Sequence, residues 1–155
     1  MRKLMVVAGA FSIAMPLTFL IPGTASAATC SGYGCDGVSA TASGCSSDAY
    51  TAEQVNVYDS HESGIELGYV QLRYSPSCRT VWAKTVNFNE GYVAAVVHRN
   101  SDGVTESCSG GTYSSSYGGW ACQTNMLYDG NVTSYAWGEL EDSLGYDITA
   151  QTSSY

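Results

Sequence analysis

Apolar and polar residues alternate along short segments of the chain after residue 51, and this alternation predicts β-strands. Turn-forming residues separate the segments roughly every eight to twelve positions. The predicted strands are Gln54–Val57, Ile65–Tyr74, Arg79–Val86, Tyr92–Arg99, Val104–Cys108, Trp120–Tyr128 and Val132–Trp137, with one more short strand at Tyr146–Ala150. No segment keeps the spacing of an amphipathic helix over three turns. The pattern therefore predicts an all-β fold, a small disulfide-stabilised sandwich or barrel of about seven short strands.

Details of the pattern predict where strands bend and where they end. The apolar positions of Ile65–Tyr74 change phase just after Gly68, which is the effect of a β-bulge. Tyr92–Arg99 is nearly all apolar and is therefore expected to be a central strand covered on both faces. Asn100–Gly103 and Asp129–Gly130 have the composition of hairpin turns, so the strands on either side of each are expected to pair.

Residues 1–27 have the layout of a secretory signal peptide. Two basic residues come first, an apolar run covers Leu4–Ile21, and Ala25-Ser26-Ala27 supplies a small-residue cleavage sequence. Cleavage there would leave residues 28–155, the length of a single domain. Within that secreted domain, residues 28–51 are rich in Gly, Ser, Ala and Cys and are expected to form an irregular arm, whereas residues 52–155 form the β body.

The six cysteines all lie in the part of the chain that export would leave: Cys30, Cys35, Cys45, Cys78, Cys108 and Cys122. An even number of cysteines in a short exported chain predicts a disulfide framework. A zinc site is the alternative, but no pair of these cysteines has the close spacing of a zinc knuckle. Cys108 and Cys122 enclose a Gly/Ser/Tyr-rich segment, and we expect them to pair and close a loop of about fifteen residues. The residues themselves leave the pairing of the other four open.

Charge and hydropathy exclude several classes of partner. The net charge is −8, and it becomes −10 once Arg2 and Lys3 leave with the signal peptide. A domain this acidic cannot neutralise many phosphates, so no nucleic-acid partner is expected. No second apolar run is long enough to span a bilayer, so no membrane association is expected after cleavage. The sequence indicates no cofactor and does not specify the oligomeric state.

Signatures of catalysis and metal binding are weak. His61 and His98 are the two histidines, and Glu139, Glu141 and Asp142 form the densest acidic cluster. A His–carboxylate pair among them would suit a small hydrolase if the two lay within hydrogen-bond reach beside a cleft. No nucleophile-elbow motif and no calcium-binding pattern is present. We therefore expect a solvated acidic segment, no catalytic residue and no metal site.

Aromatic residues offer a better candidate for function. Tyr113, Tyr117 and Trp120 lie on the Gly/Ser-rich segment, and they are the predicted contact surface because such side chains add contact area at low entropy cost. The basic residues outside the signal peptide are few, and they are expected to form internal pairs with the more numerous acids. These basic residues are Arg73, Arg79, Lys84 and Arg99.

Two blocks of the sequence resemble a known family. The first block runs from Cys30-x4-Cys35-Asp36-Gly37 to Gly44-Cys45-x-x-Asp48-Ala49-x-Thr51. The second block is Val70-Gln71-Leu72-Arg73-Tyr74-Ser75-Pro76-Ser77-Cys78-Arg79-x-x-Trp82-Ala83-Lys84. Together they resemble a family of secreted actinobacterial and bacillar proteins that is classed as domain of unknown function 2690.

The resemblance implies a shared secreted domain and a Gram-positive host, and it transfers no catalytic residue. It also implies that the first four cysteines, Cys30, Cys35, Cys45 and Cys78, pair among themselves. Members of the family usually carry Lys-Asp-Pro after the Asp-Gly step, where this chain has Val38-Ser39-Ala40. Any function of those three residues in the family is therefore in doubt for this chain.

Three functions from different classes fit these observations. The leading hypothesis is a non-enzymatic interaction module, secreted to the exterior or the cell wall, which binds an extracellular protein or a wall glycan. The second is an inhibitor of another protein, which would present the Ser75-Pro76-Ser77 turn beside Cys78. The third is the small hydrolase with a His–carboxylate pair.

Overall fold

The computed structural model describes residues 27–155, so the predicted signal peptide lies outside the described residues except for Ala27. The described part contains ten strands: β1 (Tyr50–Tyr58), β2 (Glu66–Ser75), β3 (Thr80–Asn87), β4 (Val93–Arg99), β5 (Thr105–Ser109), β6 (Thr112–Ser114), β7 (Gly119–Gln123), β8 (Leu127–Tyr128), β9 (Ser134–Glu141) and β10 (Asp147–Gln151). Two short 3-10 helices precede them, η1 (Gly32–Cys35) and η2 (Cys45–Asp48). Neither of these helices approaches the length and apolar character needed to cross a membrane.

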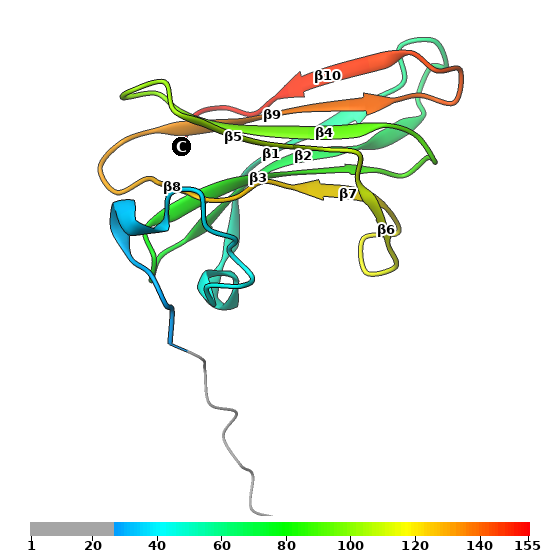
Figure 1. Cartoon of the computed structure of the whole chain (residues 1–155). Coiled ribbons are helices and arrows are strands. Elements are labelled where there is room, and N and C mark those ends of the chain that lie inside the picture. The colour runs from blue at the N-terminus through cyan, green and yellow to red at the C-terminus, as the bar shows by residue number, and fades with distance from the viewer. Residues whose placement is uncertain (1–26) are drawn as a thin grey trace, which may run out of the picture.

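The strands form two antiparallel sheets that pack face to face (Figure 1). Sheet A has the strand order β1-β2-β3-β7-β6, and β8 pairs with the first residues of β3. Sheet B has the order β10-β9-β4-β5. Apolar side chains from both sheets form the core between them, among them Val70, Leu72, Val97 and Leu140. This β-sandwich confirms the predicted all-β class and excludes the barrel for the described residues.

The structure contains strands that the pattern did not predict. β6 forms inside the Gly/Ser-rich segment and pairs with β7 as a hairpin. The predicted strand Trp120–Tyr128 is in fact two strands, because the residues between β7 and β8 leave the regular ladder. There the hydroxyl of Thr124 accepts the backbone N–H of Ala83, and the N–H of Met126 donates to the carbonyl of Val38 in the arm.

A β-bulge lies where the change of phase predicts it. In the pairing of β1 with β2, Val57 lies opposite Gly68 and Tyr58 lies opposite Glu66, so Leu67 is an extra residue. The bulge lets Leu67 and Val70 both reach the core although they differ in phase. Glycine is needed at position 68 because an added Cβ would collide with the backbone carbonyl of Val86 on β3.

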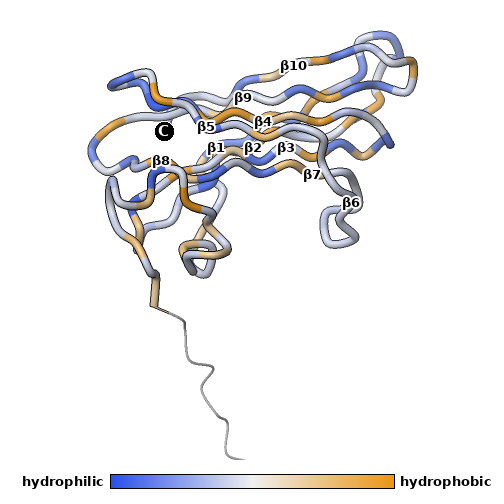
Figure 2. The backbone as a smooth tube through the Cα atoms, viewed as in Figure 1, coloured by the Kyte–Doolittle hydropathy of each residue, from blue (hydrophilic) through white to orange (hydrophobic). Residues whose placement is uncertain are grey.

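The strand covered on both faces is β3, and the expectation that Tyr92–Arg99 would be this strand was wrong. All eight residues of β3 are buried, whereas the outward-facing Val96 and His98 of β4 are partly exposed. The inner face of β3 contacts sheet B, and on its outer face Trp82 packs under the N-terminal arm. Figure 2 shows hydrophobic positions recurring along the strands of both sheets, while the turn between β4 and β5 is hydrophilic.

One disulfide and one ion-pair network hold the N-terminal arm against the sandwich. The Cys45–Cys78 disulfide joins the arm to the β2–β3 turn, and the carboxylate of Asp48 accepts hydrogen bonds from the same turn. At the other side of the arm, Asp36 lies 2.8 Å from a guanidinium nitrogen of Arg99 on β4. The arm is irregular in sequence but is fixed at both of these points.

Asp129-Gly130 is a connection between the two sheets, so the hairpin predicted there is wrong. β8 pairs with β3 in sheet A, whereas β9 pairs with β4 and β10 in sheet B. The carboxylate of Asp129 is buried in this connection and accepts a hydrogen bond of 2.6 Å from the Ser134 hydroxyl. A local turn signal indicates where the chain changes direction, but it does not show that the next strand joins the other sheet.

Asp129 makes stability depend on pH. Burial raises the pKa of Asp129 to about 6, and the hydrogen bond from Ser134 and the charge of Arg99 oppose that shift only in part. In the unfolded chain the Asp129 carboxyl has its ordinary pKa of 3.8. Between about pH 4 and pH 6, therefore, this carboxyl is protonated in the folded protein and ionised in the unfolded chain. The contribution of Asp129 to the free energy of unfolding therefore declines as the pH rises through that window.

The Asp129→Asn variant removes this titration and keeps an oxygen that can accept the Ser134 hydroxyl. We expect the variant to gain stability relative to the wild type as the pH rises from about 4 to about 7. Urea titrations of both proteins at several pH values measure this difference and cancel the effect of the other carboxylates. A difference that stays constant across the window would contradict the assignment.

Candidate functional site

Lys84 is a buried lysine without an acidic partner in the described residues. It lies on the outer face of β3 and is 6% exposed. Its ammonium nitrogen lies 4.2 Å from the ring centroid of Tyr117 and 5.9 Å from that of Tyr69, so the two aromatic faces are its main neighbours. No ion pair or hydrogen bond to another residue of the range 27–155 reaches this nitrogen. Of the four basic residues, Arg99 alone forms ion pairs with acids in the described residues, so the expectation of internal pairs was wrong for Arg73, Arg79 and Lys84.

This environment changes the acidity of the amine. Burial lowers the pKa of Lys84 to about 8, and the positive charge of Arg73 adds to the effect. At neutral pH the side chain is still mostly charged, and two cation–π contacts compensate for only part of its lost hydration. A negatively charged group of a ligand would supply the missing partner at this position.

Amide side chains continue the polar surface on both sides of Lys84. Gln54, Gln71, Lys84 and Gln123 occupy one row across four adjacent strands of sheet A. Gln71 donates to Gln54 through a hydrogen bond of 2.6 Å, and its own Oε1 is buried without a partner. The indole nitrogen of Trp82, two residues from Lys84 on the same face, is also buried without a partner. The row thus contains a donor, the Lys84 ammonium, and an acceptor, Gln71 Oε1, without a hydrogen-bond partner in the described residues, whereas Trp82 lies under the arm.

The three residues of the predicted contact surface point in different directions. Tyr117 lies in the β6–β7 turn and covers Lys84 on the outer face of sheet A. Tyr113 and Trp120 are cross-strand partners on β6 and β7, and their ring centroids are 6.3 Å apart. Tyr113 is the most exposed of the three, at 62%. Tyr117 therefore belongs to the Lys84 site, whereas Tyr113 and Trp120 form a separate aromatic pair at the sheet edge.

Sequence reasoning missed Lys84 as a site residue, although a signal was present. Trp82, Lys84 and Val86 share one phase of β3, so a lysine stands in an otherwise apolar phase. Arg73 and Arg99 have evident structural roles. Arg73 donates to Thr51 and to the carbonyl of Ala49, which fixes the end of the arm.

The structure brings together one His–carboxylate pair. Nδ1 of His61 lies 3.0 Å from a carboxylate oxygen of Asp142, which satisfies one of the two conditions for a hydrolase. The second condition, a cleft beside the pair, is not met, because the described residues enclose no pocket. The Ser60 hydroxyl lies 3.3 Å from the same Nδ1 atom that faces Asp142. His98 stacks on Tyr135 at 4.8 Å.

Asp142 is 2% exposed, so the expectation of a wholly solvated acidic segment was wrong at this residue. Burial opposes the ionisation of Asp142, but hydrogen bonds from the backbone of Tyr146 and Leu144 and from His61 outweigh burial and lower its pKa. Buried and partly exposed residues alternate along β9, and Glu139 and Glu141 are on the partly exposed face, away from the core.

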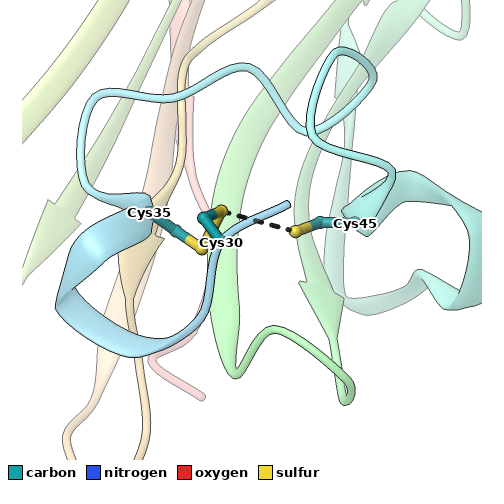
Figure 3. A group of neighbouring side chains, drawn as sticks. All are labelled: Cys30, Cys35 and Cys45. Atoms are coloured by element: carbon teal, nitrogen blue, oxygen red, sulfur yellow. Dashed lines mark hydrogen bonds between the residues drawn. A yellow bond between two sulfur atoms is a disulfide. The ribbon is translucent and has the colours of Figure 1, made fainter. Parts of the chain in front are cut away.

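The cysteines supply no thiolate for a metal in the described residues. The disulfides are Cys30–Cys35, Cys45–Cys78 and Cys108–Cys122. Figure 3 shows the first bridge beside Cys45, whose sulfur lies 3.9 Å from that of Cys30. The third bridge connects β5 of sheet B to β7 of sheet A. In the arm, Ala40 is buried in the cluster around Trp82, and Val38 packs against it.

Comparison with known proteins shows where the chain belongs. A family model described as "Protein of unknown function (DUF2690)" matches residues 33–137. The chain is 33% identical over 162 aligned positions to "Uncharacterized protein YjfA" of Bacillus subtilis (strain 168), and the alignment covers 100% of both chains. No solved structure matches the chain. Since the family model spans well over half of the chain and the relative matches along its whole length, the chain belongs to the DUF2690 family.

Proposed function

We propose that this chain is a secreted, non-enzymatic binding module that uses the outer face of sheet A to bind an acidic glycan of the cell wall. The observation that carries the proposal is Lys84, a buried cation whose neighbours in the described residues are two aromatic rings and no acid. Buried charges are normally paired, so a ligand carboxylate or phosphate is the natural partner.

The surroundings of Lys84 suit a carbohydrate. The glutamine amides of the row carry both donors and acceptors, which match hydroxyl and acetamido groups. The exposed part of Tyr117 offers an aromatic face for stacking on a sugar ring. A surface without an enclosed pocket also suits a polymer better than a small substrate.

Export is supported from two directions. The first 27 residues have the layout of a signal peptide, and the described part of the chain holds three disulfides. Disulfides persist in oxidising surroundings and are rare in the cytosol, so this framework fits a protein that works outside the cell.

The experiment is a binding assay with purified Gram-positive cell-wall glycan and two variants. Lys84→Met removes the charge and keeps a long apolar side chain under Tyr117, and Arg79→Met removes one exposed charge elsewhere as the matched control. We expect Lys84→Met to weaken binding by roughly tenfold or more, because a charge-assisted contact is lost, and Arg79→Met to change it by less than about twofold. The melting temperature of Lys84→Met is expected to stay the same or rise, since an unpaired buried charge is removed.

The pH dependence gives a second readout on the same proteins. The amine of Lys84 is charged below its pKa of about 8, so binding of an acidic glycan by the wild type should decline as the pH rises through about 8. Equal binding by the wild type and Lys84→Met would exclude Lys84 as the site. Binding of secreted proteins but of no wall glycan would show that the glycan is the wrong ligand.

A further inference from the structure

A second cluster of ionisable groups lies at one end of the sandwich, away from the Lys84 site. Asp59 and His61 belong to the connection between β1 and β2, and Asp142 directly follows β9. Figure 1 shows the β1–β2 and β9–β10 connections at the same end of the molecule. Each of the three side chains has a ligand atom within 4.8 Å of the others, so two loops that belong to different sheets meet at this point.

The two carboxylates are buried and lack a permanent cation. The side chains of Asp59 and Asp142 are 1% and 0% exposed, and their only ion-pair partner in the described residues is His61. Asp59 accepts the N–H groups of His61 and Glu62 through Oδ1 alone, so its Oδ2 has no hydrogen-bond partner in this part of the chain. His61 is therefore the shared side-chain partner of two buried carboxylates in the described residues, and a cation at this point would contact all three side chains.

The geometry suits a small divalent cation. Nδ1 of His61 lies 3.0 Å from Oδ2 of Asp142 and 3.9 Å from Oδ1 of Asp59. Zinc binds histidine nitrogen and carboxylate oxygen at about 2.0–2.2 Å, so one ion can contact two atoms that are up to about 4 Å apart. The ring of Tyr146 stacks on His61 at 4.2 Å and 25°, which holds the imidazole in place beside the carboxylates.

We propose that Asp59, His61 and Asp142 form a site for a divalent transition-metal cation, with Zn²⁺ favoured by its nitrogen and oxygen ligands. The bound ion would tie the β1–β2 loop of sheet A to the β9–β10 loop of sheet B. His61 is 41% exposed, so at least one coordination position faces solvent. This inference is independent of the proposed glycan binding at Lys84.

The test is Zn²⁺ binding by isothermal titration calorimetry, with the melting temperature measured in parallel with added zinc and with a chelator. His61→Ala removes one ligand, and His98→Ala is the matched control because it removes the only other histidine. Loss of a residue that hydrogen-bonds to a metal ligand typically weakens metal affinity about 10–100-fold. His61→Ala removes a direct ligand, so its zinc affinity should fall by at least about 100-fold. His98→Ala should bind as the wild type does.

The thermal readout separates a metal site from a simple ion pair. Zinc should raise the melting temperature of the wild type and of His98→Ala and leave that of His61→Ala unchanged, since a ligand stabilises only a fold that binds it. The Asp142→Asn variant keeps an oxygen that accepts the N–H groups of Leu144 and Tyr146, and it should also lose zinc binding. Absence of zinc binding by the wild type, or equal binding by all four proteins, would overturn the proposal.

Discussion

Replacement of Arg99 by leucine is expected to lower the free energy of unfolding by about 3 kcal/mol. Arg99 is 3% exposed, and its guanidinium forms ion pairs of 2.8 Å with both Asp36 and Asp102. Removal of one partner of a buried pair leaves the remaining charges without compensation. The two carboxylates are themselves partly exposed, so the expected loss is at the lower end of the range for buried pairs.

The loss is large because Arg99 serves three parts of the fold at once. Asp102 lies in the β4–β5 turn, and Asp36 lies in the arm, where its other oxygen accepts the N–H of Tyr128 at the end of β8. The same guanidinium donates to the carbonyl of Tyr128 and lies over the ring of Tyr33. One side chain thus joins the arm, β8 and sheet B.

Urea titration measures the effect, with Arg79→Leu as a control that removes an exposed arginine. The control should lose less than about 1 kcal/mol. Arg99→Lys should be more stable than Arg99→Leu but less stable than the wild type, because one ammonium group cannot reproduce the contacts of the guanidinium with both Asp36 and Asp102. Equal losses for Arg99→Leu and Arg79→Leu would show that the network contributes little to stability.

Removal of the Cys45–Cys78 disulfide is expected to cost about 4 kcal/mol, the largest effect of any of the three bridges. Chain-entropy arguments make the contribution grow with the length of the closed loop, and this bridge spans 33 residues. The Cys30–Cys35 bridge spans 5 residues, for which the same argument gives about 2 kcal/mol. Cys45 and Cys78 are also fully buried against Trp82, so their loss disturbs the packing of the arm as well.

Two double variants test this order. The free energies of unfolding of Cys45→Ala/Cys78→Ala and Cys30→Ala/Cys35→Ala are compared with that of the wild type under the same oxidising conditions. The first variant should be the less stable of the two by about 2 kcal/mol. A smaller loss from the longer bridge would show that the arm is held mainly by the Arg99 network and not by its covalent link.

Local patterns in the sequence were enough to predict most of the strands. Alternation of apolar residues located β2, and the change of phase at Gly68 identified its bulge, because a bulge shifts every later side chain to the other face. Pairings between distant segments were harder to predict. The Asp129 signal specified a reversal of the chain, but nothing local shows that β8 and β9 pair with different strands.

The two candidate sites depend on contacts that the sequence does not encode locally. Lys84 owes its environment to Tyr117, which the β6–β7 hairpin returns to the face of β3. His61 and Asp142 are 81 positions apart and meet only because the sheets stack with these two loops at one end. Residue type made His61 and Asp142 candidates, and the packing of the two sheets made them neighbours.

The irregular pairing of β1 has a consequence for the protein in concentrated solution. β1 is the outer strand of sheet A, and its register with β2 shifts twice, between Thr51 and Glu53 and between Val57 and Tyr58. An outer strand with regular spacing would offer its free backbone groups as a template for another molecule, which is the first step towards aggregation. The first shift leaves Ala52 as an extra residue in β1 itself and interrupts that template, and Glu53 adds a charge beside it. The nine-residue edge therefore resists edge-to-edge polymerisation.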